Sequence, residues 1–469
     1  VRSRFAGDEG QKSLDAFVAS VAEEIATRER REVVKEENGI LIEPGDVEKL
    51  SEALIRYCMN QETVEKIGKN NIALIHTKYS MDAMHQKLAQ YYIDVMQEKN
   101  FGSQLQVLAT VKKVEELDCK PEIIRYKKKI TPTFIVQTIP RLFNISFVKS
   151  KLSGNQKDKA LKSKPFYQKQ VQQRNQRFNA FLDKYFAPLF SESYGGWETL
   201  VAKCKKNYDA FLCGSDQLWL PNNLGSHFYT LEFAPDNKPK IAYATSFGVS
   251  QIPDGQKKTT AKYLNRFQHL STRELAGQKI VKELTGKMAQ VVCDPTLLFD
   301  AEGWKQMLSE KKIVEEPYVF CYFLGTNEEH RKIANEFKSK TGLKLVTCPF
   351  LDNYVECDLN FGDIQLFDMD ASDFMNLIRH AEYILTDSFH GSVFSILNHK
   401  KFMTFNRFNA GANSRNSRID SLCTLLGLSE RRYNGDIMNV EKDINYNAVE
   451  EKLEKLRADS IKYLETALK

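Results

Sequence analysis

From about residue 100 the chain alternates short apolar runs with segments of helical periodicity, and this alternation constrains the fold most. Short apolar runs fit buried strands, and apolar residues three and four positions apart fit helices. The pattern is typical of an α/β fold with parallel sheets, because parallel strands need long, usually helical crossovers. The expected strands are Ile123–Tyr126, Ala210–Cys213, Ile241–Ala244, Val291–Cys293, Tyr318–Phe323, Lys344–Thr347, Tyr383–Thr386 and Lys401–Asn406.

A charged run over 310–317, followed by a fresh apolar run, divides this part of the chain into two halves. A chain of 469 residues is long enough for more than one core. We predict a domain over 99–469, with halves at about 99–312 and 313–430 and a helical tail over 431–469. The expected helices are Leu105–Leu117, Lys257–Phe267, Ala276–Thr285, Glu328–Thr341, Ala371–His380 and His390–Leu397.

The first hundred residues follow a different pattern, and 1–29 are left unassigned. A short apolar strand at 39–42 leads into a turn and three helical segments, the last running from Asp82 through Leu88 to Tyr92. The run 37–50 resembles the C-terminus of nucleotide-sugar glycosyltransferases with the GT-B fold. The acceptor domain of that family is absent, so 30–98 is expected to be a fragment without transferase activity.

Composition argues against several classes of protein. No apolar run approaches the roughly 18 residues of a membrane helix, and the start lacks the apolar core of a secretory signal. The 9 cysteines form no CxxC pair and fit buried thiols in a reducing compartment. A net charge of +6 does not by itself indicate nucleic-acid binding. We expect a cytoplasmic protein that binds no nucleic acid.

Basic residues crowd the segment 125–184. One interpretation is a solvated insertion. The other is a surface that holds the protein against anionic lipid at the inner face of the cell membrane, or against an anionic glycan.

Two segments place small and polar residues beside expected elements. Asn100 to Gln104 opens a helix, whose free N–H groups attract anions, although an ordinary loop is the better explanation of this segment alone. The segment 214–219 follows a buried strand, and open α/β sheets bind ligands at the carboxyl ends of their strands. Within it, Asp216 either binds a ligand or caps the turn, and Trp219 either stacks on a sugar ring or fills the core. The candidate residues of this segment are Gly214, Ser215, Asp216 and Trp219.

Two further segments carry charged or titratable residues. Arg273 is followed by a glutamate, a pairing that is usually a surface ion pair. In 384–395 an apolar strand stops and a helix begins near His390, a position suited to anion binding or acid–base work. We expect this turn to direct side chains and free N–H groups at one point. Its candidates are Asp387, Ser388, His390, Gly391 and Ser392.

These four segments, in this order, resemble the polysaccharide pyruvyl transferase family. The resemblance spans about 100–433 and includes the runs 240–248, 294–298 and 413–419, the last with Arg415 and Arg418. It implies a GT-B-like pair of Rossmann-like α/β halves with the site in the cleft between them. It also implies phosphoenolpyruvate as the donor, a functional Arg273 and His390, and a lipid-linked or polymeric glycan as the acceptor.

The residue types suit this chemistry, which needs no cofactor or metal besides the donor. Arg273 is expected to bind the anionic donor through its planar fork. His390 would donate a proton or neutralise the departing phosphate, and Asp216 or Asp387 would accept the sugar hydroxyl's proton. The alternatives are a nucleotide-sugar glycosyltransferase and a catalytically decayed glycan-binding fusion.

Overall fold

The computed structural model describes residues 2–3, 7–8, 88–90, 99–127, 165–221, 227–352, 355–408 and 416–469. The chain forms two compact units, Val1–Met84 and His85–Lys469. In the first unit, the described residues form an antiparallel pair of strands, β1 (Arg2–Ser3) and β2 (Gly7–Asp8). The glycosyltransferase-like run, Arg415 and most of the basic segment 125–184 lie outside the described residues.

The first half of the second unit is built on a seven-stranded sheet in which all neighbouring strands run parallel, in the order β5-β4-β3-β6-β7-β8-β9. Its strands are β3 (Leu88–Gln90), β4 (Pro121–Lys127), β5 (Phe190–Gly195), β6 (Ala210–Cys213), β7 (Lys240–Ala242), β8 (His269–Thr272) and β9 (Gln290–Val291). Its helices are α6 (Phe101–Glu116), α9 (Pro165–Tyr185), η1 (Ala187–Leu189), α10 (Trp197–Asn207), α11 (Asp254–Leu264), α12 (Leu275–Thr285), η3 (Pro295–Leu298) and α13 (Ala301–Met307).

The second half is built on a five-stranded parallel sheet in the order β12-β11-β10-β13-β14. Its strands are β10 (Tyr318–Tyr322), β11 (Lys344–Thr347), β12 (Ile364–Gln365), β13 (Tyr383–Thr386) and β14 (Lys401–Thr404). Its helices, with those that follow, are α14 (Glu328–Thr341), η4 (Glu356–Asp358), α15 (Ala371–His380), α16 (Phe389–Leu397), α17 (Ser417–Leu426), η5 (Ser429–Arg431), η6 (Ile437–Glu441) and α18 (Tyr446–Leu468).

Two parallel sheets flanked by helices confirm the predicted α/β fold class. All five residues of β10 are buried, as expected for a parallel strand that is covered on both faces. All eight expected strands are present with small shifts at their ends, and α14 and α15 have the predicted bounds. The short strands β5, β8 and β12 were not anticipated, because their residues lack a long apolar run.

One expectation about the N-terminal side was wrong. Leu88 was placed on a helix, but it begins β3, which pairs with β4 on one edge and with β6 on the other. Pairing on both edges supplies hydrogen bonds from distant parts of the chain, which local helical periodicity does not report. The first sheet therefore includes residues upstream of 99.

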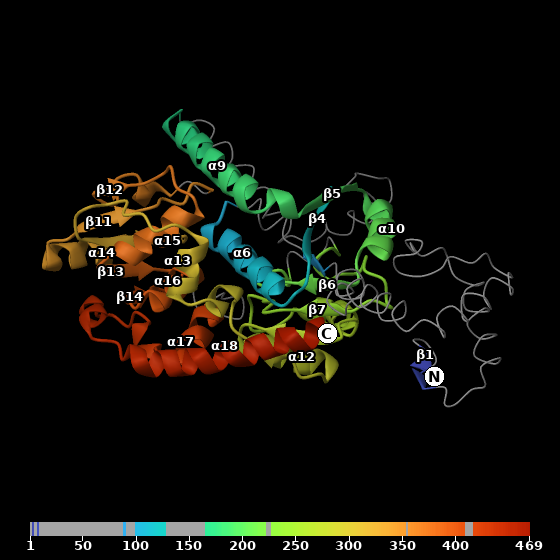
Figure 1. Cartoon of the computed structure of the whole chain (residues 1–469). Helices are drawn as coiled ribbons and strands as arrows, with labels where there is room; N and C mark the ends of the chain where they lie inside the picture. The colour runs from blue at the N-terminus through green and yellow to red at the C-terminus, as the bar shows by residue number, and fades with distance from the viewer. Residues whose placement is uncertain are drawn as a thin grey trace, which may run out of the picture. The chain divides into compact units, whose positions relative to one another are not determined.

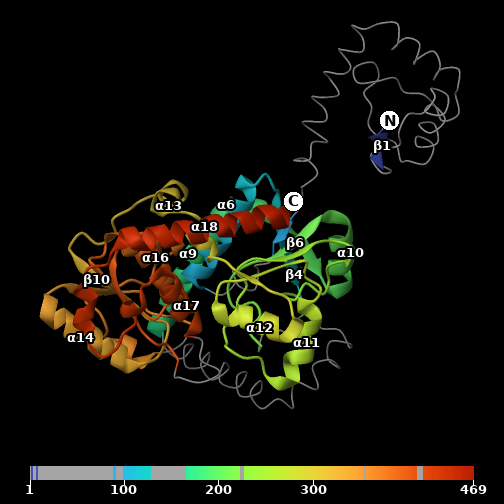
Figure 2. The ribbon, with the colours of Figure 1, turned by 90° about the horizontal axis from the view of Figure 1, so that it is seen from below.

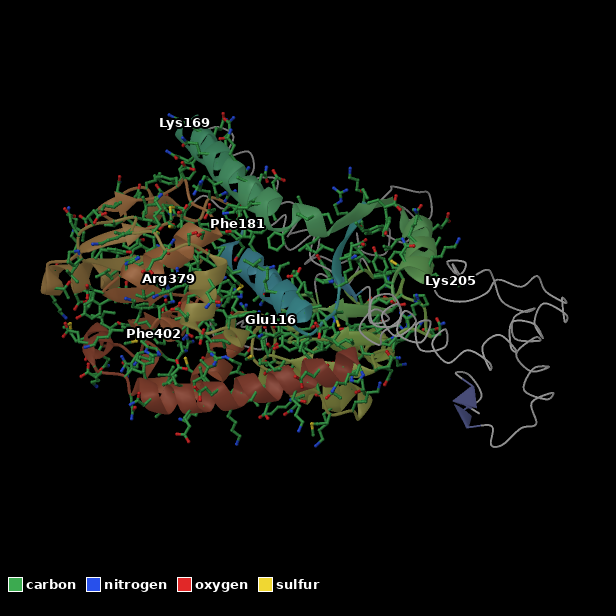
Figure 3. All side chains as sticks on the ribbon, viewed as in Figure 1. Glu116, Lys169, Phe181, Lys205, Arg379 and Phe402 are labelled. Atoms are coloured by element: carbon green, nitrogen blue, oxygen red, sulfur yellow. The ribbon has the colours of Figure 1, made fainter. Side chains whose placement is uncertain are left out.

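The two sheets share a core. One hydrophobic cluster contains Leu105 of α6 together with Ile241 of the first sheet and Phe320 of the second. Phe181 on α9 and Phe402 on β14 belong to the same cluster, whereas basic side chains such as Lys169 and Lys205 are exposed (Figure 3).

The last helix, α18, contacts both halves. It extends from the elements around β14 to those around β7 (Figure 1), and Figure 2 shows the same helix from below. Near its start, Tyr446 donates a hydroxyl hydrogen bond to the backbone oxygen of Lys400, and near its end Tyr463 donates one to the backbone oxygen of Ala242. Among the described residues, no helix combines the length and the apolar character that a bilayer span requires.

Candidate active site

Polar side chains from both halves meet where several strands end. Asp216 follows β6, Arg273 follows β8 and Asp294 follows β9, all at the carboxyl edge of the first sheet. His390, in the first turn of α16, reaches the same place from the second half. The carboxyl edge of a parallel sheet is where α/β proteins place their ligands, so this cluster is the candidate active site.

Arg273 lies at the centre of the cluster, and both terminal nitrogens of its guanidinium are engaged, whereas its buried Nε has no hydrogen-bond partner among the described residues. Its Nη1 donates to Asp294 Oδ2 at 2.7 Å and to Ser215 Oγ at 3.2 Å, and its Nη2 donates to Asp216 Oδ1 at 3.2 Å. The guanidinium carbon Cζ lies 4.5 Å from the ring centroid of Phe389. Only 1% of the side chain is exposed. The two terminal nitrogens of the guanidinium each donate to a protein carboxylate.

Asp294 joins the two halves and was not among the predicted site residues. Ser215 Oγ donates to Asp294 Oδ2 at 2.7 Å, and Thr296 Oγ1 donates to Oδ1 at 2.6 Å. His390 Nε2 lies 3.7 Å from Oδ1. Burial alone would raise the pKa of Asp294, but His390, Arg273 and Thr296 outweigh it and hold this pKa well below its usual range. The signal was present in the run 294–298, where an aspartate follows a short apolar run.

His390 is packed so closely that one glycine is required beside it. A Cβ atom on Gly102 of α6 would lie 2.0 Å from Nδ1 of the imidazole. The ring is 6% exposed, and Nε2 has no hydrogen-bond partner apart from the ion-pair contact with Asp294. The glycine of the 100–104 segment therefore makes room for the imidazole, a role that the sequence did not reveal.

Asp216 is the carboxylate of the cluster with the most access to solvent, at 18% side-chain exposure. Its backbone has φ of +80°, a conformation that non-glycine residues rarely adopt, in the turn after β6. Ser103 Oγ donates to Oδ2 at 2.9 Å, which adds a second unpredicted residue. Burial would raise the pKa of Asp216, but Arg273, His390 and Arg418 lower it overall, so this carboxyl is ionised.

Arg418, at the start of α17, is a buried cation without a carboxylate partner among the described residues. It is 8% exposed and lies 5.9 Å from the Phe389 ring centroid, so Phe389 contacts both Arg273 and Arg418. The side-chain oxygen of Gln217, oriented toward Arg418, accepts from its Nε and Nη2 at 3.3 Å. Burial and the nearby charge of Arg273 lower the pKa of Arg418 to about 9, which still leaves it protonated near neutral pH.

The turn before α16 differs from the expectation. Gly391 N donates to Ser388 Oγ at 3.3 Å, and Ser392 N donates to the Ser388 carbonyl at 3.0 Å. These N–H groups are not free, because Ser388 is the N-cap of the helix. A Cβ on Gly391 would lie 2.6 Å from Thr386 Oγ1, so the glycine is needed for packing against β13 rather than for approach to a ligand.

Asp387 holds a backbone loop. Its Oδ1 accepts from Leu324 N at 2.7 Å and its Oδ2 from Gly325 N at 2.8 Å. Arg407 Nε lies 3.5 Å from Oδ1, and its Nη2 donates to the Asp387 carbonyl. Both carboxylate oxygens are thus engaged by the loop after β10, which makes Asp387 a poor acceptor for a substrate proton.

Trp219 fills the core and does not face a ligand. It is fully buried, its Nε1 donates to the Tyr229 carbonyl at 3.1 Å, and its ring packs 5.2 Å from Phe247 and 5.4 Å from Phe267. The substrate-binding interpretation of Trp219 is therefore wrong. An indole at this position gains more from aromatic packing than from solvent exposure.

The remaining predicted residues lie around the cluster, and none of them has a charged side chain. Asn100 is the N-cap of α6, and its Oδ1 accepts from Ser103 N. Gln104 is buried, with Nε2 donating to the Phe178 carbonyl and Oε1 without a partner. The Gly214 carbonyl accepts from Thr245 Oγ1 at 2.8 Å.

Glu274, next to Arg273, is a second carboxyl that the predicted site did not include. Its Oε1 accepts from Ser246 Oγ at 2.8 Å and from Phe247 N at 3.1 Å. Complete burial raises its pKa even though Arg273 opposes the shift. The cluster thus contains carboxyls whose pKa values are shifted in opposite directions.

Two surface hollows of about 530 and 460 Å³ lie elsewhere, the first around Arg379 and His399 and the second around Ile252 and Ile280. Neither is lined by Arg273, Asp294 or His390. Across the described ranges, His, Cys, Asp and Glu side chains form no group of three suited to a metal ion.

Comparison with known proteins assigns the family. The sequence pattern of the polysaccharide pyruvyl transferases matches residues 100–407, well over half of the chain, and this span includes Asp216, Arg273, Asp294 and His390. The chain belongs to the polysaccharide pyruvyl transferase family. Membership implies an enzyme of polysaccharide biosynthesis that takes a pyruvyl donor and a polysaccharide acceptor. Arg418 and α18 lie beyond the matched residues.

Solved structures show weak overall similarity to this chain. UDP-GlcNAc 2-epimerase from Methanocaldococcus jannaschii has a TM-score of 0.40 and 9% identity, covering 72% of this chain and 91% of that one. Acinetobacter baumannii MurG has a TM-score of 0.37 and 9% identity, with coverages of 81% and 98%. E. coli heptosyltransferase WaaC with ADP has a TM-score of 0.33 and 14% identity, with coverages of 79% and 99%. A search of curated proteins finds no match in sequence.

Proposed function

We propose that this enzyme transfers the pyruvyl group of phosphoenolpyruvate to two hydroxyls of a sugar in a cell-surface or exopolysaccharide precursor. The product is a cyclic ketal, and inorganic phosphate is released. The observation that carries the proposal is the meeting of Arg418, a buried guanidinium without a carboxylate partner among the described residues, with the Arg273–Asp294–His390 chain at one carboxyl sheet edge. A small, multiply charged anion matches this arrangement.

Arg418 is assigned as the main anchor of the anionic donor. Its guanidinium lacks a carboxylate partner among the described residues, so a donor oxygen would replace only a neutral amide contact. Arg273 would have to break its bonds to Asp294 and Asp216 in order to bind the donor through its fork. Its proposed role is therefore to hold these two carboxylates and to add positive charge, while Phe389 keeps the two guanidinium groups apart.

His390 is assigned as the proton donor to the methylene carbon of the donor. The ionised carboxylate of Asp294 lies beside Nε2, and the absence of a side chain at Gly102 leaves room for the ring. Asp216 is assigned as the acceptor of the sugar hydroxyl's proton, because it is the most accessible carboxylate of the cluster. A positioned acid or base typically contributes a rate factor of about 10² to 10⁴.

The reaction balances without an oxidant or reductant. A proton adds to the methylene carbon, and the first hydroxyl oxygen bonds to the adjacent carbon. The bond from that carbon to the phosphate oxygen then breaks, and the second hydroxyl oxygen takes its place. One hydroxyl proton replaces the proton given to carbon, and the other leaves with phosphate.

The test incubates the full chain with phosphoenolpyruvate and a panel of lipid-linked and aryl glycosides. Acceptor-dependent release of inorganic phosphate, with a product heavier by one pyruvyl ketal, is the expected result. Release of a nucleoside diphosphate from a nucleotide sugar, without use of phosphoenolpyruvate, would instead identify a glycosyltransferase. Donor-dependent turnover with no acceptor or with every acceptor equally would also contradict the proposal.

A further inference from the structure

The segment that carries Asp294 is held from both sides by the last helix. The Cys293 N–H, directly before Asp294, donates to Ser460 Oγ of α18 at 2.9 Å. The Leu297 carbonyl, three residues after Asp294, accepts from Arg457 Nε of the same helix at 2.8 Å. Asp294 is thus bracketed by two contacts from one element that lies far away in the sequence.

The surroundings of these two contacts leave the backbone around Asp294 little room to move. Ser460 is fully buried, and its hydroxyl donates to the Leu456 carbonyl at 2.6 Å, which leaves the oxygen facing the Cys293 N–H. Asp294 itself caps η3 by accepting from Thr296 N, so the carboxylate and the helical turn move together. A displacement of the backbone at Cys293 or Leu297 would therefore displace the carboxylate that contacts Arg273 and His390.

The same helix is also anchored in the second half. Tyr446 near its start bonds to the Lys400 carbonyl, Glu450 pairs with His399 at 2.9 Å, and Leu453 is buried in the shared core. His390 belongs to that half, on the helix directly before His399. Because α18 is fixed to both halves, it sets the position of Asp294 relative to His390.

We infer that α18 is a positioning element of the active site and that Ser460 and Arg457 are positioning residues for Asp294. This role rests on the proposed function of the Arg273–Asp294–His390 chain. It extends the site beyond the residues that the family pattern matches, because α18 begins at Tyr446 and the match ends at 407. Neither residue touches the substrate in this proposal, so both act through the geometry of Asp294.

The test compares Ser460→Ala with Ser460→Thr and with the matched control Tyr446→Phe in the full chain. Tyr446→Phe also removes one hydroxyl of α18 that contacts a backbone group, but at the opposite end of the helix. Ser460→Ala should lower kcat on the order of tenfold, with the donor KM changed by less than about twofold, since small misplacements impair the chemical step more than binding. Ser460→Thr should restore kcat, and Tyr446→Phe should leave it nearly unchanged, because Glu450 and Leu453 still hold α18 to the second half. Equal kcat losses in Ser460→Ala and Tyr446→Phe, or no loss in Ser460→Ala, would overturn the inference.

A second measurement separates this inference from the proposed function. Amide hydrogen exchange of the free protein is followed over 291–298, without donor or acceptor. Ser460→Ala should accelerate exchange there, whereas Ser460→Thr and Tyr446→Phe should match the unsubstituted chain. The proposed function fails if no acceptor supports phosphate release. The positioning role fails separately if amide exchange over 291–298 is unchanged in Ser460→Ala.

Discussion

Each sheet carries an aspartate–arginine contact at its carboxyl edge, and the two contacts differ in what surrounds them. In the first half, Asp294 binds Arg273 at 2.7 Å and is also contacted by His390 from the second half. In the second half, Asp387 lies 3.5 Å from Arg407, but its oxygens accept from two backbone N–H groups of one loop. One aspartate links titratable side chains across the halves, and the other shapes a loop. The same pair of residue types therefore joins titratable side chains across the halves in one case and shapes local backbone structure in the other.

His390 should show the largest effect, because it joins the Asp294 contact to the second half. His390→Gln is expected to lower kcat by a factor of about 10² to 10⁴, since the proposed acid is lost while an amide of similar length keeps the packing. The measurement is phosphate release at saturating phosphoenolpyruvate, with the thermal midpoint as a control for folding. A folded variant that keeps more than about a tenth of the activity would reject His390 as the acid.

Replacing each of the two aspartates by asparagine tests the comparison directly. Asp294→Asn should lower kcat about 10²-fold and destabilise the fold by about 3–5 kcal/mol, because it leaves the buried Arg273 charge without its main partner. Asp387→Asn should cost about 1–3 kcal/mol of stability, since two backbone donors lose a charged acceptor, with a much smaller change in kcat. Both quantities follow from steady-state kinetics and urea unfolding. Equal losses of kcat in the two variants would contradict the comparison, because they would show that both contacts contribute equally to catalysis.

Arg418 and Arg407, one without a carboxylate partner among the described residues and one beside Asp387, give the next contrast. Arg418→Met should raise the donor KM about 10- to 100-fold, which is the equivalent of one lost charge-assisted hydrogen bond of about 1.5–3 kcal/mol. Arg407→Met should raise it far less, because Arg407 is occupied by Asp387. Calorimetric titration with phosphoenolpyruvate measures both affinities. A weaker donor affinity in Arg407→Met than in Arg418→Met would reverse the assignment.

The smallest effect concerns stability against pH. The folded pKa of Asp294 is depressed, so its contribution is present above the unfolded value of about 3.9 and is lost as pH falls through the folded value. Burial raises the folded pKa of Glu274, so its effect has the opposite sign and lowers stability as pH rises above about 4.3. Asp294→Asn should weaken the loss of stability in acid, and Glu274→Gln should raise stability at neutral pH relative to pH 4. Urea midpoints between about pH 3 and 7, compared between each variant and the unsubstituted chain, give the slope of stability against pH that Asp294 and Glu274 each contribute. Contributions of the same sign would contradict the assigned pKa shifts.

Much of the site could be found from the sequence because strand ends leave local signals. The apolar run before 387–390 and the small residues after Cys213 indicated where two parallel strands stop, and Arg273 and His390 were both named. Asp294 and Ser103 were missed, since an aspartate after a strand and a serine in a first helical turn are common as caps. Trp219 was misjudged, because exposure depends on neighbours such as Phe267 that lie far along the chain.

By itself, the sequence determined the elements, their order and the residue types available at the strand ends. These follow from periodicities and capping preferences that act over a few neighbouring residues. Only the tertiary structure decided which groups are occupied: Arg273 is bound by its own carboxylates, the Gly391 N–H is used by Ser388, and Arg418 remains without a carboxylate among the described residues. Whether a charge is paired depends on atoms brought together from segments far apart in the chain, as α18 and Asp294 are. No local sequence pattern shows which distant groups come into contact.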